Sequence, residues 1–138
     1  MTDHAFAKGK KKEAVAKTTV KKGEGTIKIN NQPLKLYTPE LYRKMIKEPI
    51  KIAEDILGEE EIQGIKIKTN VKGGGKAGQA EATRTSIGKA LVEWSDSEEL
   101  KEKYREYDRS ILVDDYRRKE PKKPLRKGAR AKPIKSYR

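Results

Sequence analysis

Residues 65–78 read Ile65-Lys66-Ile67-Lys68-Thr69-Asn70-Val71-Lys72-Gly73-Gly74-Gly75-Lys76-Ala77-Gly78. Up to Lys72, apolar or small side chains alternate with polar ones, and this period of two is typical of a strand buried on one face only. Three glycines then end the strand, and apolar residues follow at helical spacing: Ala80, Ile87, Leu91 and Trp94. The segment predicts a strand over 65–72 with a cationic outer face, a glycine loop, and a helix over about 76–94.

The residues before this segment predict two shorter strands and a helical region. Alternation over 14–21 and over 26–30 indicates two strands, and the glycine-containing turn 22–25 between them predicts a hairpin. Thr38-Pro39-Glu40 carries the features of a helix start. Pro49 is expected to interrupt that helix, a second helical stretch ends at Gly58, and residues 59–61 are expected to form a solvated loop.

The residues after the long helix predict one more helix. Ser95 and Glu98 fit a capping box that begins a charged helix ending near Tyr107, and residues 111–113 are expected to add an edge strand. This order of elements is typical of an α+β sandwich in which helices cover one face of a mixed sheet. The opposite face of the sheet is expected to carry lysines.

The charge distribution predicts three regions. The 138 residues carry a formal net charge of +13. Residues 117–138 contain eleven basic residues and one acid, a net +10. We expect a basic, mobile N-terminus over 1–12, a folded domain over 13–116, and an extended basic tail over 117–138. A nearly neutral domain with a strongly cationic tail indicates a polyanionic partner, either RNA, DNA or an acidic membrane.

The composition excludes several classes of protein. The chain has no cysteine and one histidine, His4, which excludes a disulfide framework, a cysteine-bearing zinc site and Cys-His or Ser-His catalysis in the folded region. No apolar run resembles a signal peptide or a membrane span, so we expect a cytoplasmic protein that does not insert into a membrane. We expect no metal, no cofactor and no enzymatic activity.

The glycine loop allows more than one interpretation. Gly73–Gly78 matches the pattern G-x-G-x-x-G, but a dinucleotide-binding strand is buried on both faces, whereas this one alternates with lysines. A phosphate-contacting loop fits better, because Lys72, Lys76 and Arg84 flank glycines that permit close backbone approach. A tight turn that serves only the fold is the structural alternative. A nucleotide-dependent enzyme and a polybasic membrane-surface protein remain the rival functional classes.

Several segments together resemble the family of the universal ninth protein of the small ribosomal subunit. They are Gly9–Lys17, Gly25–Asn30, Val71–Ala80 followed by Arg84, Ile87, Ala90 and Leu91, and then Lys119–Pro124 and Leu125–Arg130. The resemblance extends from about Gly9 to Arg138. The C-terminal Lys135-Ser136-Tyr137-Arg138 resembles the archaeal and eukaryotic form, whereas many bacterial members end in Ser-Lys-Arg.

The resemblance implies a fold like the second domain of ribosomal protein S5, with a mixed four-stranded sheet, helices on one face and a left-handed strand–helix–strand crossover. It implies a structural protein of the subunit head that contacts ribosomal RNA and neighbouring ribosomal proteins, and whose tail reaches peptidyl-site tRNA. The residues expected to contact tRNA are Lys135, Tyr137 and Arg138. Those expected to contact ribosomal RNA are Lys10, Lys11, Lys12, Lys72, Gly73, Gly74, Gly75, Lys76, Gln79, Arg84, Lys122, Lys123, Arg126, Lys127 and Arg130.

Overall fold

The central strand of the sheet is β5 (Ile65–Lys72), at the residues that the alternation predicts. The computed structural model describes residues 4–37, 40–114 and 124. Its sheet has five strands in the order β1-β2-β5-β3-β4, and β3 and β5 are parallel while the other neighbours are antiparallel. The predicted α+β class with a mixed sheet is confirmed, but the sheet has one strand more than expected.

The additional strand at one edge is β1 (His4–Lys11), which pairs along its whole length with β2 (Ala14–Lys22). The sequence predicts a mobile segment here, and the structure instead places residues 4–11 in the sheet. The small residues Ala5 and Gly9 are buried against the long helix α3 (Lys76–Ser95), and a Cβ at Gly9 would collide with the backbone of α3. Close packing of a small-residue face therefore orders a segment whose other face is basic.

The predicted hairpin between residues 14–21 and 26–30 is wrong. The backbone N–H groups of Gly23 and Gly25 donate to the carbonyls of Gly64 and Ile65, at 3.0 and 2.9 Å. The chain thus crosses the start of β5, and β3 (Ile27–Ile29) pairs with the far side of β5. The hairpin forms instead between β3 and β4 (Gln32–Pro33), through Asn30 and Asn31, whose φ angles of 51° and 66° suit a two-residue turn.

The helices follow the sequence pattern with three differences. α1 (Glu40–Leu57) continues through Pro49, where we expected an interruption. α2 (Glu59–Gln63) forms where we expected a solvated loop. The 3₁₀ helix η2 (Arg109–Ile111) replaces the expected edge strand, because Asp108 caps it by accepting from the Ser110 N–H.

The helices α3 and α4 agree with the predicted helices, and a short 3₁₀ helix joins two other elements. α3 begins at Lys76 and ends one residue beyond the predicted Trp94. α4 (Glu98–Tyr107) covers the predicted residues, but its N-cap is Ser97, whose Oγ accepts from the Leu100 N–H at 3.2 Å. The 3₁₀ helix η1 (Leu34–Leu36) joins β4 to the residues before α1.

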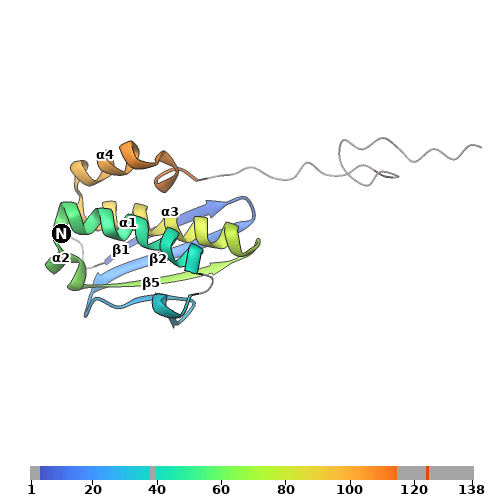
Figure 1. Ribbon diagram of the computed structural model, residues 1–138, viewed down its shortest axis with the longest axis horizontal. Helices are drawn as coiled ribbons and strands as arrows, with labels where there is room; N and C mark the ends of the chain where they lie inside the picture. The colour runs from blue at the N-terminus through green and yellow to red at the C-terminus, as the bar shows by residue number, and fades with distance from the viewer. Residues whose placement is uncertain (1–3, 38–39, 115–123, 125–138) are drawn as a thin grey trace, which may run out of the picture.

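The helices α1 and α3 cover one face of the sheet, and α4 packs on α1 (Figure 1). The core lies between the sheet and the two helices, and Ile46, Val20, Ile67, Ile87 and Leu91 are among its fully buried side chains. Tyr104 of α4 is also buried, and its Oη donates to the carbonyl of Pro49 at 2.7 Å. The other face of the sheet has no helix over it among the described residues.

Candidate nucleic-acid interface

The helix-free face of the sheet is cationic. Side chains alternate between the two faces along each strand, so the residues that lie between successive core residues share this face. None of the five strands contains Asp or Glu. The strand register places Lys10 at the edge of this face, and we define the lysine face by the other seven lysines there: Lys8, Lys17, Lys21, Lys28, Lys66, Lys68 and Lys72.

Lysines lie directly opposite lysines on this face. The register pairs Lys8 with Lys17, Lys21 with Lys66, and Lys28 with Lys68. Like charges opposite each other in a sheet destabilise it. Within the ranges 4–37 and 40–114, none of the seven lysine side chains forms an ion pair. The positive charge of this face is therefore available to a partner.

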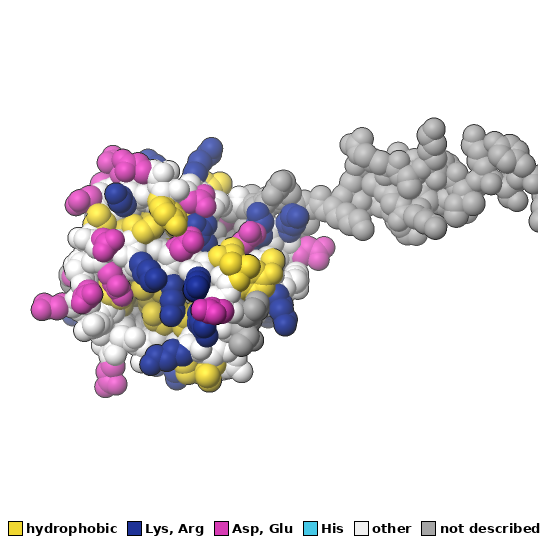
Figure 2. Space-filling view, viewed as in Figure 1, with side chains coloured by type: hydrophobic (Ala, Val, Ile, Leu, Met, Phe, Trp, Pro, Cys, Tyr) yellow, Lys and Arg dark blue, Asp and Glu magenta, His cyan; other side chains and the backbone are white. Residues whose placement is uncertain are grey.

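The side of the domain covered by helices carries acidic as well as basic side chains, unlike the lysine face. Figure 2 shows acidic and basic side chains interspersed over the side seen in Figure 1. Several of these charges neutralise each other, as in the contact of Lys44 Nζ with Glu40 Oε1 at 3.5 Å. The separation of charge between the two sides makes the lysine face the stronger candidate for a polyanion among the described surfaces.

The glycine loop, residues 73–75, joins β5 to α3 and lies against the β1–β2 turn. Gly73 and Gly74 have φ angles of +85° and +66°. A Cβ at Gly73 would lie 2.5 Å from the carbonyl oxygen of Glu13, and one at Gly74 would lie 3.2 Å from atoms of Ala14. These two glycines are required by the fold, which supports the tight-turn interpretation for both.

Gly75 is different from its two neighbours. Its φ of −96° and ψ of 178° are open to any residue, and a Cβ there would have nothing within 4 Å. Lys72 and Lys76 are exposed on the two sides of the loop, and the Gln79 side chain donates to the Gly73 carbonyl at 3.2 Å. The loop thus presents an open backbone between two cations, and Gln79 holds its conformation.

The predicted cations of the N-terminal segment lie beside this loop. Lys11 Nζ is 3.3 Å from Glu81 Oε2 of α3, and Lys12 is exposed in the β1–β2 turn with a φ of +55°. Together with Gly74 and Gly75 they line one shallow depression. The structure therefore brings Lys11, Lys12 and the glycine loop together at one end of the sheet.

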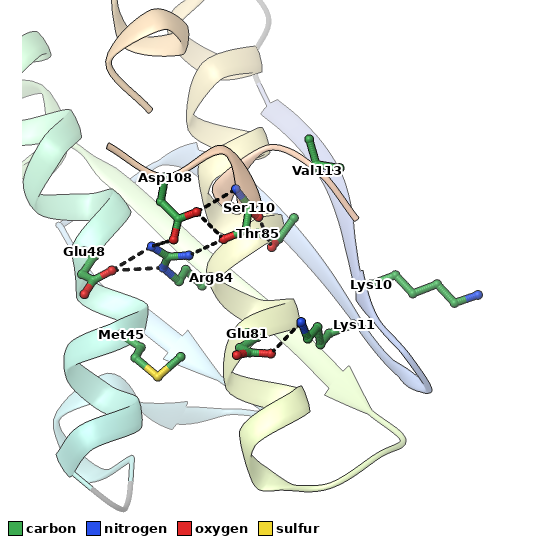
Figure 3. Close-up of a pocket in the computed structure, with 10 residues that line it drawn as sticks. All are labelled: Lys10, Lys11, Met45, Glu48, Glu81, Arg84, Thr85, Asp108, Ser110 and Val113. Carbon is green, nitrogen blue, oxygen red and sulfur yellow. Dashed lines mark hydrogen bonds and ion pairs between the residues drawn. The ribbon is translucent and has the colours of Figure 1, made fainter. Parts of the chain in front are cut away.

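Lys10 lies near the point where the described domain ends. Its backbone N–H donates to Asp114 Oδ1 at 3.1 Å, and Lys89 Nζ of α3 contacts the same oxygen at 2.6 Å. The Asp114 side chain is only 11% exposed. Asp114, the last residue of the range 40–114, is therefore held on β1 and α3, while the Lys10 side chain points away from the neighbouring pocket (Figure 3).

Arg84 is engaged inside the domain. Its guanidinium contacts Glu48 Oε2 at 2.8 Å and Asp108 Oδ2 at 3.1 Å, and it donates to Ser110 Oγ at 3.0 Å (Figure 3). Its side chain is 9% exposed. The structure thus separates Arg84 from the other predicted contact residues and places it in an ion cluster that joins α1, α3 and η2.

The Arg84 cluster also sets the ionisation of Asp108. Burial by itself would raise the pKa of the Asp108 carboxyl. The hydrogen bonds from Ser110 and the charge of Arg84 together outweigh burial, so the pKa is lower than the ordinary value. Asp108 is therefore ionised at neutral pH and available to pair with Arg84.

The other predicted site residues lie outside the described residues, and nothing in the structure tests them. They are Lys122, Lys123, Arg126, Lys127, Arg130, Lys135, Tyr137 and Arg138. Among the described residues, no group of three or more His, Cys, Asp or Glu side chains has the arrangement of a metal site. No helix of that part is both long and apolar enough to cross a lipid bilayer.

The prediction of site residues omitted most of the lysine face. Of its seven lysines, only Lys72 is among the residues that the sequence predicts to contact RNA, although the same sequence predicts a cationic outer face for the strand 65–72. Lys8 was missed because β1 was not recognised. The alternation of Ala5, Ala7 and Gly9 with His4, Phe6 and Lys8 is the signal that would have identified it.

The sequence matches one family of known proteins over most of its length. Residues 9–138 match the family model described as ribosomal protein S9/S16. The small ribosomal subunit protein uS9 of Thermoplasma volcanium is 48% identical over 136 residues, 99% of each chain. That of Picrophilus torridus is 47% identical over 138 residues, the whole of both chains, and that of Methanococcus maripaludis is 47% identical over 132 residues, 94% of this chain and 95% of the relative. The chain belongs to the ribosomal protein S9/S16 family.

Proposed function

We propose that this chain is a structural constituent of the small ribosomal subunit that binds ribosomal RNA and has no catalytic role. The observation that carries the proposal is the lysine face, in which like charges oppose each other without acidic partners. Membership of a ribosomal protein family supports RNA as the polyanion. Phosphate neutralisation is then the main source of affinity, and it depends on salt concentration.

The second part of the RNA contact is formed by the glycine loop and the β1–β2 turn. Gly75, Lys72 and Lys76 offer an open backbone and two cations, and Lys12 lies beside them. Amides at the start of α3 favour an anion there. We leave Arg84 out of the contact surface, because Glu48 and Asp108 already hold its guanidinium.

The tail extends the same chemistry beyond the domain. Its net charge of +10, interleaved with Pro, Gly and Ala, suits a segment that neutralises phosphates along an extended path. We propose that the basic residues from Lys122 to Arg130 contact ribosomal RNA in the subunit head, near neighbouring ribosomal proteins. Lys135, Tyr137 and Arg138 then contact peptidyl-site tRNA, with Arg138 on a phosphate.

Sedimentation tests the assignment. A lysate at native salt is run through a sucrose gradient with and without RNase, and the position of the chain is followed. We expect co-migration with small subunits that is lost after RNase treatment. Migration at the top of the gradient in both samples would contradict the proposal and favour an enzyme or a membrane-surface protein.

Charge variants test the surface. In K17Q/K66Q/K68Q we expect weaker binding to small-subunit RNA and a salt dependence of log affinity reduced by roughly 0.7 to 0.9 per lost phosphate contact. The matched control is K44Q/K51Q/K103Q, which removes exposed lysines of α1 and α4 instead. Equal weakening of both variants would show that only the total charge matters, and that the lysine face is not the binding surface.

A further inference from the structure

Phe6 is a large apolar side chain on the lysine face. It is the one phenylalanine of the chain, and it is 50% exposed. Its neighbour Ala5 is buried on the α3 side of β1, so Phe6 points to the opposite face. The register places it in one row with Thr19 of β2, Lys68 of β5 and Lys28 of β3.

Lysines surround Phe6 along both strands. Lys8 lies two positions further on β1, and Lys17 and Lys21 flank its partner Thr19 on β2. Such neighbours are about 7 to 8 Å from Phe6, within reach of a flexible lysine side chain. An aromatic ring thus lies among cations on a surface whose strands carry no acidic residue.

The surroundings of the ring decide between two kinds of partner. An apolar protein surface would cover Phe6 only by removing water from the neighbouring lysines without pairing them, which is unfavourable. A nucleotide offers a flat base for the ring and a phosphate for the lysines. The combination of ring and charges therefore fits a nucleic-acid strand better than a protein. Single exposed apolar residues are common on protein surfaces, so the test must separate stacking from mere exposure.

We propose that Phe6 is a stacking platform for an unpaired nucleobase of bound RNA, with Lys8, Lys17 and Lys21 on the phosphates of the same strand. The inference rests on the proposed RNA-binding role of the lysine face, and it adds a base contact to a surface that otherwise holds phosphates. Phe6 precedes residue 9, where the match to the family model begins. The site therefore belongs to the N-terminal strand of this chain.

Binding by the full-length chain tests the proposal with two probes. One is a single-stranded oligoadenylate, and the other is inorganic polyphosphate, which offers charge without bases. We expect F6A and F6L to weaken oligoadenylate binding by roughly 5- to 150-fold and to leave polyphosphate binding unchanged. F6W and F6Y should bind both probes as the wild type does. K17Q should weaken both.

The fluorescence of F6W reports stacking at this position directly. Trp94 is 7% exposed, so its signal in the wild type serves as a background. We expect quenching of the new indole by oligoadenylate and none by polyphosphate, while thermal unfolding stays unchanged because Phe6 lies outside the core. Wild-type affinity of F6A for oligoadenylate, or an equal loss for both probes, would overturn the stacking site.

The two proposals fail in different ways. If the wild type binds polyphosphate but not oligoadenylate, the stacking site is wrong. If it binds neither probe and does not co-sediment with small subunits, the RNA-binding function is wrong as well. Co-sedimentation that persists in F6A, together with its expected loss of oligoadenylate affinity, would support both proposals.

Discussion

Gly75 is a glycine that the fold of this chain does not require. Its φ is negative and a Cβ there would meet nothing within 4 Å. We therefore expect Gly75→Val to change the free energy of unfolding by less than about 1 kcal/mol. If RNA approaches the backbone here, the same substitution weakens binding to small-subunit RNA. Urea unfolding and RNA titration of the variant measure the two effects separately.

Gly73→Ala is the matched control, because Gly73 has a φ of +85° and its Cβ position lies 2.5 Å from the Glu13 carbonyl oxygen. We expect this variant to lose stability by about 1 to 2 kcal/mol or more. If Gly75→Val instead binds RNA with wild-type affinity, the loop is only a turn between β5 and α3.

Arg84 lies at the centre of an ion cluster with two carboxylates. We expect Arg84→Met to lower the free energy of unfolding by about 1 to 3 kcal/mol, because it removes charge-assisted hydrogen bonds whose partners are partly open to solvent. Chemical denaturation at pH 7 measures this loss. The salt dependence of RNA binding should stay unchanged. A slope of log affinity against log salt reduced by the amount of about one phosphate contact would show that Arg84 binds a phosphate.

The candidate site could be predicted in part from single residues. The lysines of β5 and the three glycines follow from local alternation and local composition, which the sequence shows directly. The different requirement for Gly73 and Gly75 depends on the β1–β2 turn, about sixty residues away in the chain. Arg84 likewise pairs with Glu48 and Asp108, which lie far from it in sequence. Such partners cannot be identified from local patterns.

Among the elements, α4 is held on α1 by one buried hydrogen bond. Tyr104 Oη donates to the Pro49 carbonyl, and burial raises the pKa of Tyr104 well above its ordinary value of 10.0. The neutral phenol is therefore favoured in the folded state. The stability that this contributes is complete below pH 10 and is lost as the pH rises further, since the unfolded chain ionises first.

We expect Tyr104→Phe to lower the free energy of unfolding by about 1 kcal/mol at pH 7 and to reduce the additional loss above pH 10. Urea titrations at both pH values measure the difference. Tyr107→Phe on the same helix is the control, because Tyr107 is exposed. A pH dependence that is identical in Tyr104→Phe and the wild type would show that Tyr104 does not cause the alkaline loss.

The elements that could be predicted from sequence are those with a long periodic pattern. β5, α3 and α4 each show a full alternating or helical repeat, and the structure confirms them. β1 was missed because its buried face consists of Ala5, Ala7 and Gly9, which contribute little hydrophobicity. The β2–β3 hairpin was wrong because adjacency in the chain does not show that β5 comes between the two strands.

At the scale of the whole molecule, the lysine face makes the free protein sensitive to salt. Because Lys8, Lys21 and Lys28 each lie opposite another lysine, we expect the melting temperature of the free chain to rise as salt screens these pairs. Thermal unfolding at low and high ionic strength measures the effect. Lys17→Gln should reduce the dependence, and a melting temperature independent of salt would contradict the expectation.

We expect tRNA retention to depend on the last residues of the chain, and folding and incorporation into the subunit to be independent of them. We expect deletion of residues 136–138 to leave folding and incorporation into the small subunit unchanged, since the described core is formed within residues 4–114, and to weaken tRNA retention in the peptidyl site. Filter binding of tRNA to purified subunits measures retention, and gradient sedimentation measures incorporation. Unchanged retention would contradict the role that we propose for Arg138.

Asp114 has a kinetic consequence through its contacts with the Lys10 N–H and the Lys89 ammonium. Asp114 is the last residue of the continuous range that the structure describes, and residues 115–138, at about 3.3 Å each, place the C-terminal residue within roughly 80 Å of it. Once the domain has docked, each tail contact is an intramolecular event at an effective concentration set by the tether. If the end of the chain binds tRNA as we propose, weak individual contacts are therefore sufficient for high occupancy, and one tRNA can be exchanged for the next without dissociation of the protein.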